Sequence, residues 1–255
     1  MRGYIPPQNT QETIFVKRAS ELLQKAEDYY TIQYSAFLDL RQKELFKAQS
    51  NRYTDIEVSF ECGYDGAGER CLAVVRPFSF PIEEKDIPIV VLTSKLYENN
   101  ITHRDLLGAI MNLKITRDYI GDIIADQECA YLVVHSNVSE IIIQELKQVK
   151  NSAVEFSVYK NRLSCIEKTA DLKSATVASM RIDAIIAALL QISRSEGLKL
   201  IKQGRVKVNQ LEVCSADFEM FDGDIISVKQ IGKYKIFCDG NKSRKDRMFI
   251  NFAKY

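Results

Sequence analysis

A basic helix followed at once by a basic strand is the part of this sequence whose residue types could do chemistry. In the stretch SRSEGLKLIKQGRVKVNQ, Ser193 and Glu196 have the Ser-x-x-Glu spacing of a capping box, which predicts that a helix begins at Ser193. Gly204 stands where a glycine commonly ends a helix. The next five residues alternate, so Arg205 and Lys207 share the face opposite the valines. Lysine and arginine attract phosphate, and arginine binds it with two hydrogen bonds.

A single basic helix face is most often only solvated, so the rest of the chain decides how much this segment means. Residues 180–255 hold 14 Lys and Arg against 9 Asp and Glu, a net charge of +5. Residues 1–179 hold 21 against 25, a net charge of −4. This asymmetry favours a phosphate-bearing partner for the C-terminal end.

Composition bounds the class of protein. The 255 residues leave room for two or three domains, and 46% apolar with 27% charged residues is ordinary for a soluble chain. The sequence has no apolar run of about 18 residues and no signal-peptide core, so we expect a cytoplasmic protein without a membrane segment. The six cysteines form no C-x-x-C pair, so we expect reduced thiols. We also expect no metal and no cofactor.

Periodicity predicts an α+β chain of three small domains. We expect an N-terminal helical or α+β domain over 1–84, with helices through residues 10–50 and a hairpin near 56–75. Strands alternating with helices predict a central ferredoxin-like, RRM-like α/β sandwich over 85–165. A polar linker is expected at 166–176, and two antiparallel helices with a small sheet at 177–255.

The C-terminal part resembles the RNA-binding domain named after ribosomal protein S4. The matching elements are Arg181-Ile182-Asp183, Ser193-Arg194, the run from Gly204 to Asn209, and the run from Gly223 to Ile226. They occur in this order along the chain. The resemblance implies that the helix pair and the following strand form one basic surface that fits structured RNA.

The rest of the chain is similar to the bacterial YlmH family. The pattern is Thr-His-Arg-Asp-x-Leu-Gly-Ala at 102–109, then Arg117 and Gly121-Asp122-Ile123, with CGYDGAGER before them. Lys114 departs from the family, which usually has a Gly-Leu-Gly-Ile type turn there. The resemblance implies non-catalytic work in ribosome-associated quality control: binding tRNA and ribosomal RNA on large subunits that still carry peptidyl-tRNA. We expect a monomer whose partners are structured RNA and the large ribosomal subunit, and no membrane partner.

The residues expected to contact RNA are polar or basic and lie in the C-terminal domain. They are Arg181, Ser193, Arg194, Lys199, Lys202, Gln203, Arg205, Lys207, Asn209, Lys229, Lys233 and Lys235. A second contact is expected at Arg104 and Arg117, which could instead belong to a structural ion-pair cluster with Asp122. Asp183 is expected to be a structural partner of a nearby arginine.

An enzyme is the alternative, because this type of RNA-binding domain also occurs attached to RNA-modifying enzymes. A pseudouridine synthase uses an Asp in a His-Arg-Leu-Asp type motif, and His103-Arg104-Asp105 lacks the leucine. No Gly-rich cofactor loop of a methyltransferase is evident, and His135 has no nucleophile at motif spacing.

A protein-interaction adaptor is the third class of function. Steep weakening by salt would favour RNA binding over such an apolar interface.

Overall fold

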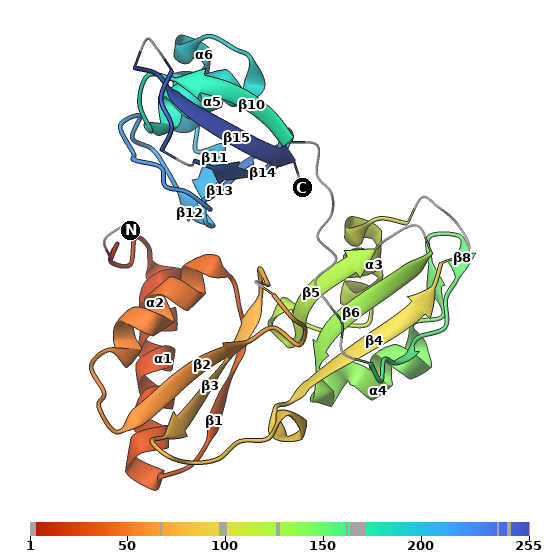
Figure 1. Ribbon diagram of the computed structural model, residues 1–255. Helices are drawn as coiled ribbons and strands as arrows, with labels where there is room; N and C mark the ends of the chain where they lie inside the picture. The colour runs from red at the N-terminus through yellow and green to blue at the C-terminus, as the bar shows by residue number, and fades with distance from the viewer. Residues whose placement is uncertain are drawn as a thin grey trace. The chain divides into compact units, whose positions relative to one another are not determined.

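The computed structural model describes residues 4–66, 68–96, 101–125, 128–161, 163, 172–238, 240–243 and 246–254 (Figure 1). The chain divides into two compact units. The N-terminal unit is Ile5–Cys165, and the C-terminal unit is Ile166–Tyr255 together with Met1–Tyr4. Over the residues described, no helix is both long and apolar enough to cross a membrane.

The first layer of the N-terminal unit is a three-stranded antiparallel sheet covered by two helices. Its elements are α1 (Thr10–Tyr29), β1 (Gln33–Leu38), α2 (Leu40–Ser50), β2 (Ile56–Glu61) and β3 (Cys71–Pro77), with strand order β1-β3-β2. Leu23 of α1 and Phe46 of α2 pack on Ala73 and Val75 of β3. The expectation of helix through residues 10–50 is therefore wrong at β1. That segment pairs with β3, which is distant in the sequence, and such tertiary pairing overrides local propensity.

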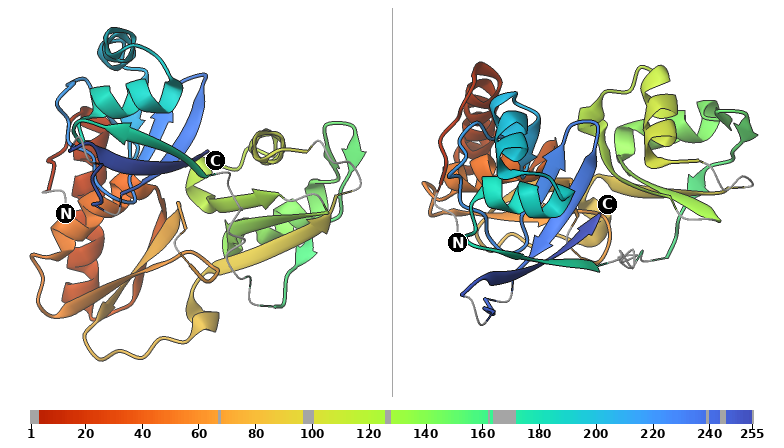
Figure 2. Two further views of the ribbon diagram at one scale, coloured as in Figure 1. Left: turned by 45° about the horizontal axis from the view of Figure 1, so that its top comes forward. Right: turned by 90° about the horizontal axis from the view of Figure 1, so that it is seen from above.

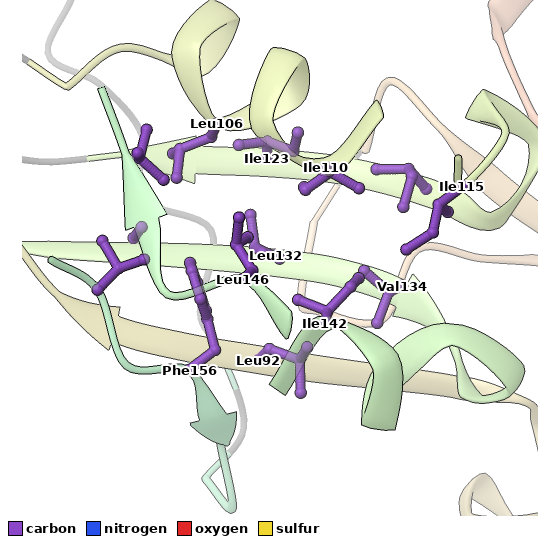
Figure 3. Packing of buried hydrophobic residues seen from close by; sticks show 14 of the residues in the cluster. Leu92, Leu106, Ile110, Ile115, Ile123, Leu132, Val134, Ile142, Leu146 and Phe156 are labelled. Carbon is purple, nitrogen blue, oxygen red and sulfur yellow. The ribbon is translucent and has the colours of Figure 1, made fainter. Parts of the chain in front are cut away.

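A second layer follows in the same unit. Its elements are η1 (Glu84–Asp86), β4 (Ile89–Lys95), α3 (His103–Asn112), η2 (Arg117–Tyr119), β5 (Ile120–Ala125), β6 (Cys129–His135), α4 (Ser136–Glu145), β7 (Gln148–Val149), β8 (Ser152–Ala153) and β9 (Ser157–Val158). The antiparallel sheet has the order β5-β6-β4-β9, and β7 pairs only with β8. Helices α3 and α4 bury Leu106, Ile110 and Ile142 against Leu92 and Leu132 of this sheet (Figure 3).

Local signals set the ends of α3. The Thr102 hydroxyl accepts the backbone N–H of Asp105, and the Asp105 carboxylate accepts the backbone N–H of Thr102, which is the predicted cap. After the helix, Lys114 takes a φ of +61°. The left-handed turn is thus kept without the glycine that the family resemblance implies there. Helix α4 ends at Glu145, just before the β7–β8 hairpin begins at Gln148.

The two layers of the N-terminal unit are joined by a small apolar cluster and a polar clasp. Phe37, Leu72 and Val74 of the first sheet pack on Val133 of the second. The clasp is centred on Asp122, and its geometry is given with the candidate site below. The two sheets therefore act as one folded unit.

The C-terminal unit packs two helices on one face of a six-stranded antiparallel sheet (Figures 1 and 2). Its elements are β10 (Leu172–Val177), α5 (Ile182–Leu190), α6 (Arg194–Lys202), β11 (Val206–Val208), β12 (Leu211–Glu212), β13 (Ile225–Val228), β14 (Gly232–Phe237) and β15 (Met248–Lys254). The strand order is β10-β15-β14-β13-β11-β12. Strand β10 occupies the second half of the segment expected to be a linker. The first half of that segment lies outside the described residues.

The expectation that all cysteines are reduced is wrong for one pair. Cys62 and Cys71 form a disulfide, with their Cα atoms 4.3 Å apart. Glu61 and Leu72 are partners in the β2–β3 ladder, so the next pair outward is Cys62 and Cys71, and the hairpin itself brings the sulfurs together. Cys214 and Cys238 are free thiols, and Cys129 is not part of a disulfide. Cys165 lies outside the described residues.

Candidate nucleic-acid interface

The helix pair α5–α6 is held in place by a capped start and a buried carboxylate. Ser193 and Glu196 form the predicted capping box, and Gly204 takes a φ of +64° after the last turn of α6. The Asp183 carboxylate is buried, and Arg194 donates to it from Nη2 at 2.6 Å. Asp183 is thus the structural partner of an arginine, as expected. Because Arg194 itself is 59% exposed, the ion pair fixes a cation that still faces solvent.

One edge of the C-terminal unit brings the end of α6 to the β13–β14 turn. Arg205, directly after α6, donates from Nη2 to the Lys229 carbonyl at 3.1 Å and to Gln230 Oε1 at 3.2 Å. A shallow groove of about 530 Å³ lies beside them. It is lined by Leu190, Ile192, Glu196, Lys199, Leu200, Gln203 and Ile231. The cations of α6 and of the turn therefore belong to one edge of the fold.

The remaining predicted lysines continue from this edge onto the sheet. Lys207 of β11 lies opposite Ser227 of β13, which lies opposite Lys233 of β14, so these side chains form one row across three strands. Lys235, two residues further along β14, has the same orientation. The alternate residues, such as Val206 and Val228, point into the core with the helices. The row thus lies on the face of the sheet away from α5 and α6.

We call the set of cations along this path the basic strip. It contains Lys199, Lys202, Arg205, Lys207, Lys229, Lys233 and Lys235. It runs from α6 past the ends of β11 and β13 onto the face of the sheet away from the helices, whereas the sequence had predicted a single face formed by the helices and the strand. No residue of the strip is buried. Glu212 on β12, opposite Lys207, is an acidic neighbour of the strip.

Two of the polar residues predicted to contact RNA are already used by the fold. The Ser193 hydroxyl is hydrogen-bonded to Glu196 in the helix cap at 2.8 Å. The Asn209 side chain donates to Asp224 at 2.8 Å and accepts the Ile225 backbone N–H at 2.9 Å. These contacts fix the start of α6 and the turn after β11. Their direct role toward RNA stays a prediction.

The predicted second contact joins two residues with different surroundings. Arg104 is exposed in the first turn of α3. The Arg117 guanidinium is largely enclosed and donates from Nη1 to the carbonyls of Ile120 at 2.8 Å and Gly121 at 3.0 Å. Burial, followed by the nearby Arg70 charge, lowers the pKa of Arg117 to about 10. The Arg117 guanidinium therefore fixes the start of β5, while the Arg104 side chain is exposed to solvent.

Asp122, from the same sequence pattern, is the centre of the clasp in that joint. Its Oδ2 accepts the Tyr64 hydroxyl at 2.6 Å and the Glu69 backbone N–H at 2.9 Å, and its Oδ1 accepts the Arg70 backbone N–H at 3.2 Å. Burial raises the pKa of Asp122, while these hydrogen bonds oppose the rise. The Arg70 side chain continues the network by donating to the Phe37 carbonyl at 2.6 Å. The Gly-Tyr and Gly-Asp patterns thus meet in a structural contact.

Sequence reasoning missed two features near these sites. The groove beside α6 depends on Ile231, which reaches it only because β13 and β14 form a tight turn. The clasp depends on residues 53 positions apart, which no local pattern connects. Within the ranges that the structure describes, no group of three or more His, Cys, Asp or Glu side chains is placed to hold a metal ion.

Comparisons with known proteins agree with this arrangement. Residues 87–162 match the family described as "Putative RNA-binding domain in YlmH", and residues 180–218 match the S4 domain. The chain is 28% identical over 248 residues to ribosome-associated protein quality control protein P2 of Bacillus subtilis (strain 168), and the match covers 95% of both chains. A solved structure, cell division protein ylmH from Streptococcus pneumoniae, is similar with a TM-score of 0.52 and 25% identity. It covers 62% of this chain and 96% of its own.

The order of the matched parts is the order of the two sites described above. The first match contains α3 and Asp122, and the second contains α5, α6 and β11. The chain belongs to the YlmH family and carries the YlmH RNA-binding domain followed by an S4 domain.

Proposed function

We propose that this protein binds tRNA and ribosomal RNA on stalled large ribosomal subunits and acts there in ribosome-associated quality control without catalysing a reaction. The observation that carries the proposal is the basic strip. Its cations are not buried and run from α6 past the β13–β14 turn onto the outer face of the sheet, where lysine and arginine can contact the phosphates of a partner. The relative from Bacillus subtilis, named as a ribosome-associated quality control protein, supports the cellular setting.

The strip favours recognition of RNA by shape and backbone. Phe237 lies beneath Lys235, with the ammonium 5.4 Å from the ring centroid, so this ring is occupied by a cation. Base stacking on the strip is therefore a minor contribution. Phosphate contacts from lysine and arginine give affinity and orientation, and structured RNA supplies phosphates at fixed positions.

The YlmH RNA-binding domain supplies the second half of the proposal. Its main elements follow the order strand, helix, strand, strand, helix, strand, with sheet order β5-β6-β4-β9, which supports a ferredoxin-like fold. Arg104 lies exposed at the N-terminal end of α3 and is the residue of this domain that we propose as a second RNA contact. Two separate contacts on one chain would let it distinguish an assembled ribosomal subunit from free RNA.

Co-sedimentation with purified large subunits tests the proposal. Subunits with and without peptidyl-tRNA are compared at two salt concentrations, using wild type, Arg104→Ala, and Asp118→Ala as an exposed control. We expect wild type to prefer subunits with peptidyl-tRNA, Arg104→Ala to weaken binding, and Asp118→Ala to leave it unchanged. Equal binding to both subunit forms would contradict the stalled-subunit role. Binding only to free structured RNA would instead favour an RNA-modifying role.

A further inference from the structure

Four exposed aromatic side chains lie on the two chain segments that meet at one end of the first layer, and we call them the aromatic patch. Tyr29 is 72% exposed, Tyr30 59%, Phe78 65% and Phe80 37%. Tyr29 and Tyr30 end α1, and the two phenylalanines follow β3, whose end lies beside the end of α1 (Figure 1). The rings of Tyr30 and Phe80 meet edge to face with centroids 5.5 Å apart. Single exposed apolar residues are ordinary, but a cluster of large rings marks an interaction surface.

The backbone holds these rings in place. Tyr30 caps α1 in the left-handed region, with φ 54° and ψ 45°, and its N–H is bonded to carbonyls of the last turn. Phe78 donates its N–H to the Asp55 carbonyl at 2.8 Å, and the Phe80 carbonyl accepts Arg76 Nη1 at 2.7 Å. Ser79 between the phenylalanines takes a φ of +72°. A patch on such a fixed backbone loses little entropy on binding, which favours a specific partner.

The charge around the patch is negative. The segments that carry or touch it, residues 24–31, 52–57 and 76–86, hold seven Asp and Glu against four Lys and Arg. Two of the four cations form ion pairs within these segments, Arg76 with Glu57 at 2.7 Å and Lys85 with Glu83 at 2.6 Å, so each pair also neutralises one carboxylate and the net charge stays at −3. Excess negative charge repels phosphate, so these rings are unsuited to stacking the bases of an RNA.

We propose that this aromatic patch docks a protein segment rich in lysine and arginine that also carries apolar side chains. Its acidic surroundings attract the cations of the segment, and the exposed tyrosine faces add cation–π contacts. The apolar side chains of the segment bury the phenylalanine rings. The chain thus has a protein-binding surface in its N-terminal unit that is separate in chemistry from the basic strip.

Fluorescence anisotropy with defined probes tests this docking surface on the full chain. The probes are a labelled twelve-residue peptide of alternating arginine and leucine, the same peptide with glutamate replacing arginine, and a twelve-nucleotide uridine RNA. The test variant is Tyr29→Ser with Phe78→Ser. The matched control is Ile14→Ser with Ile141→Ser, two side chains exposed by 42% and 45% elsewhere in the unit. Thermal unfolding checks that both variants remain folded.

We expect wild type to bind the basic peptide at least tenfold more tightly than the acidic one. The patch variant should lose at least fivefold of that affinity, while the control variant and all RNA affinities stay unchanged. Equal binding of the basic peptide by wild type and patch variant would overturn the proposal. A loss of RNA affinity in the patch variant would also overturn it, because the rings would then be stacking bases. A wild-type dimer that the variant abolishes would assign the patch to a second copy of the chain instead.

Discussion

Removing the Asp122 carboxylate should separate the two layers of the N-terminal unit. Asp122 accepts three hydrogen bonds from Tyr64, Glu69 and Arg70, all in the turn between β2 and β3. Asp122→Ala leaves all three donors without this acceptor. Asp122→Asn can keep its single carbonyl oxygen at the position of Oδ2, which holds the Tyr64 and Glu69 bonds, but its NH2 group then faces the Arg70 N–H, so the Arg70 bond is lost and two donors oppose each other.

The magnitudes follow from the number of bonds. A hydrogen bond to a charged group contributes about 1.5–3 kcal/mol, so the three bonds are together worth roughly 4–9 kcal/mol. Burial raises the pKa of Asp122, which means that desolvation of the carboxylate offsets part of this sum. We therefore expect Asp122→Ala to lower the free energy of unfolding by about 3–5 kcal/mol. Because Asp122→Asn loses a single bond, it should lower the same free energy by about 1–2 kcal/mol.

Urea denaturation followed by hydrogen exchange measures these effects in each unit separately. Peptides from β2, β3 and β5 report on the N-terminal unit, and peptides from α5 and β14 report on the C-terminal unit. Asp118→Ala, an exposed carboxylate in the same unit, is the control. The reasoning is refuted if Asp122→Asn costs as much as Asp122→Ala, because charge and not hydrogen bonding would then dominate. It is also refuted if neither variant differs from the control.

Three further outcomes are expected from single contacts. Hydrogen bonds from Lys150 and Thr102 hold the pKa of Asp105 at about 2, below the value of about 3.8 in an unfolded chain, so its contribution to stability is complete above pH 4 and is lost as the pH falls toward 2. NMR titration should find this low pKa in wild type and a higher one in Lys150→Gln. The Cys62–Cys71 disulfide closes a loop of about ten residues, so its reduction should lower the free energy of unfolding of the N-terminal unit by about 2–3 kcal/mol, and non-reducing peptide mapping should find the linked pair. A map with both thiols free would contradict the bond. Gly204→Ala should destabilise the C-terminal unit by about 1–2 kcal/mol in urea, because its φ is +64° and the new Cβ would lie 2.6 Å from Glu212 Oε1; no loss would mean that the turn relaxes freely.

The elements that the sequence predicted well are those set by local chemistry. Ser193 and Glu196 define the start of α6, and Gly204 defines its end, so three neighbouring signals determine the helix. Thr102 and Asp105 do the same for the start of α3. The outward direction of Lys207 was also predicted, because alternation along β11 follows from strand geometry.

The features that escaped prediction depend on residues far apart in the sequence. Strand β10 pairs with β15 at the other end of the C-terminal unit, with Leu172 opposite Ala253, and the polar run before β10 gives no sign of a strand partner. The sequence predicted one basic surface, but the strip continues past the strand ends onto the outer face of the sheet because the helices pack on the opposite face of β11. The aromatic patch joins Tyr30 to Phe80, which are also far from each other along the chain. A pattern of neighbouring residues does not predict which aromatic rings from distant segments lie side by side at the surface.

The salt dependence of RNA binding tests the role of the basic strip most directly. Affinity of the full chain for a labelled tRNA is measured over a range of salt concentrations for wild type and for Lys202→Ala with Arg205→Ala. The control pair is Lys173→Ala with Lys254→Ala, two exposed lysines on β10 and β15 of the same sheet. Each lost phosphate contact should reduce the slope of log affinity against log salt by about one, so the test variant should lose about two units of slope and most of its affinity. Its thermal stability should stay nearly unchanged, and the control should match wild type. A test variant with the wild-type slope, or one that loses affinity only in proportion to its loss of folding, would contradict the assignment of the strip to RNA.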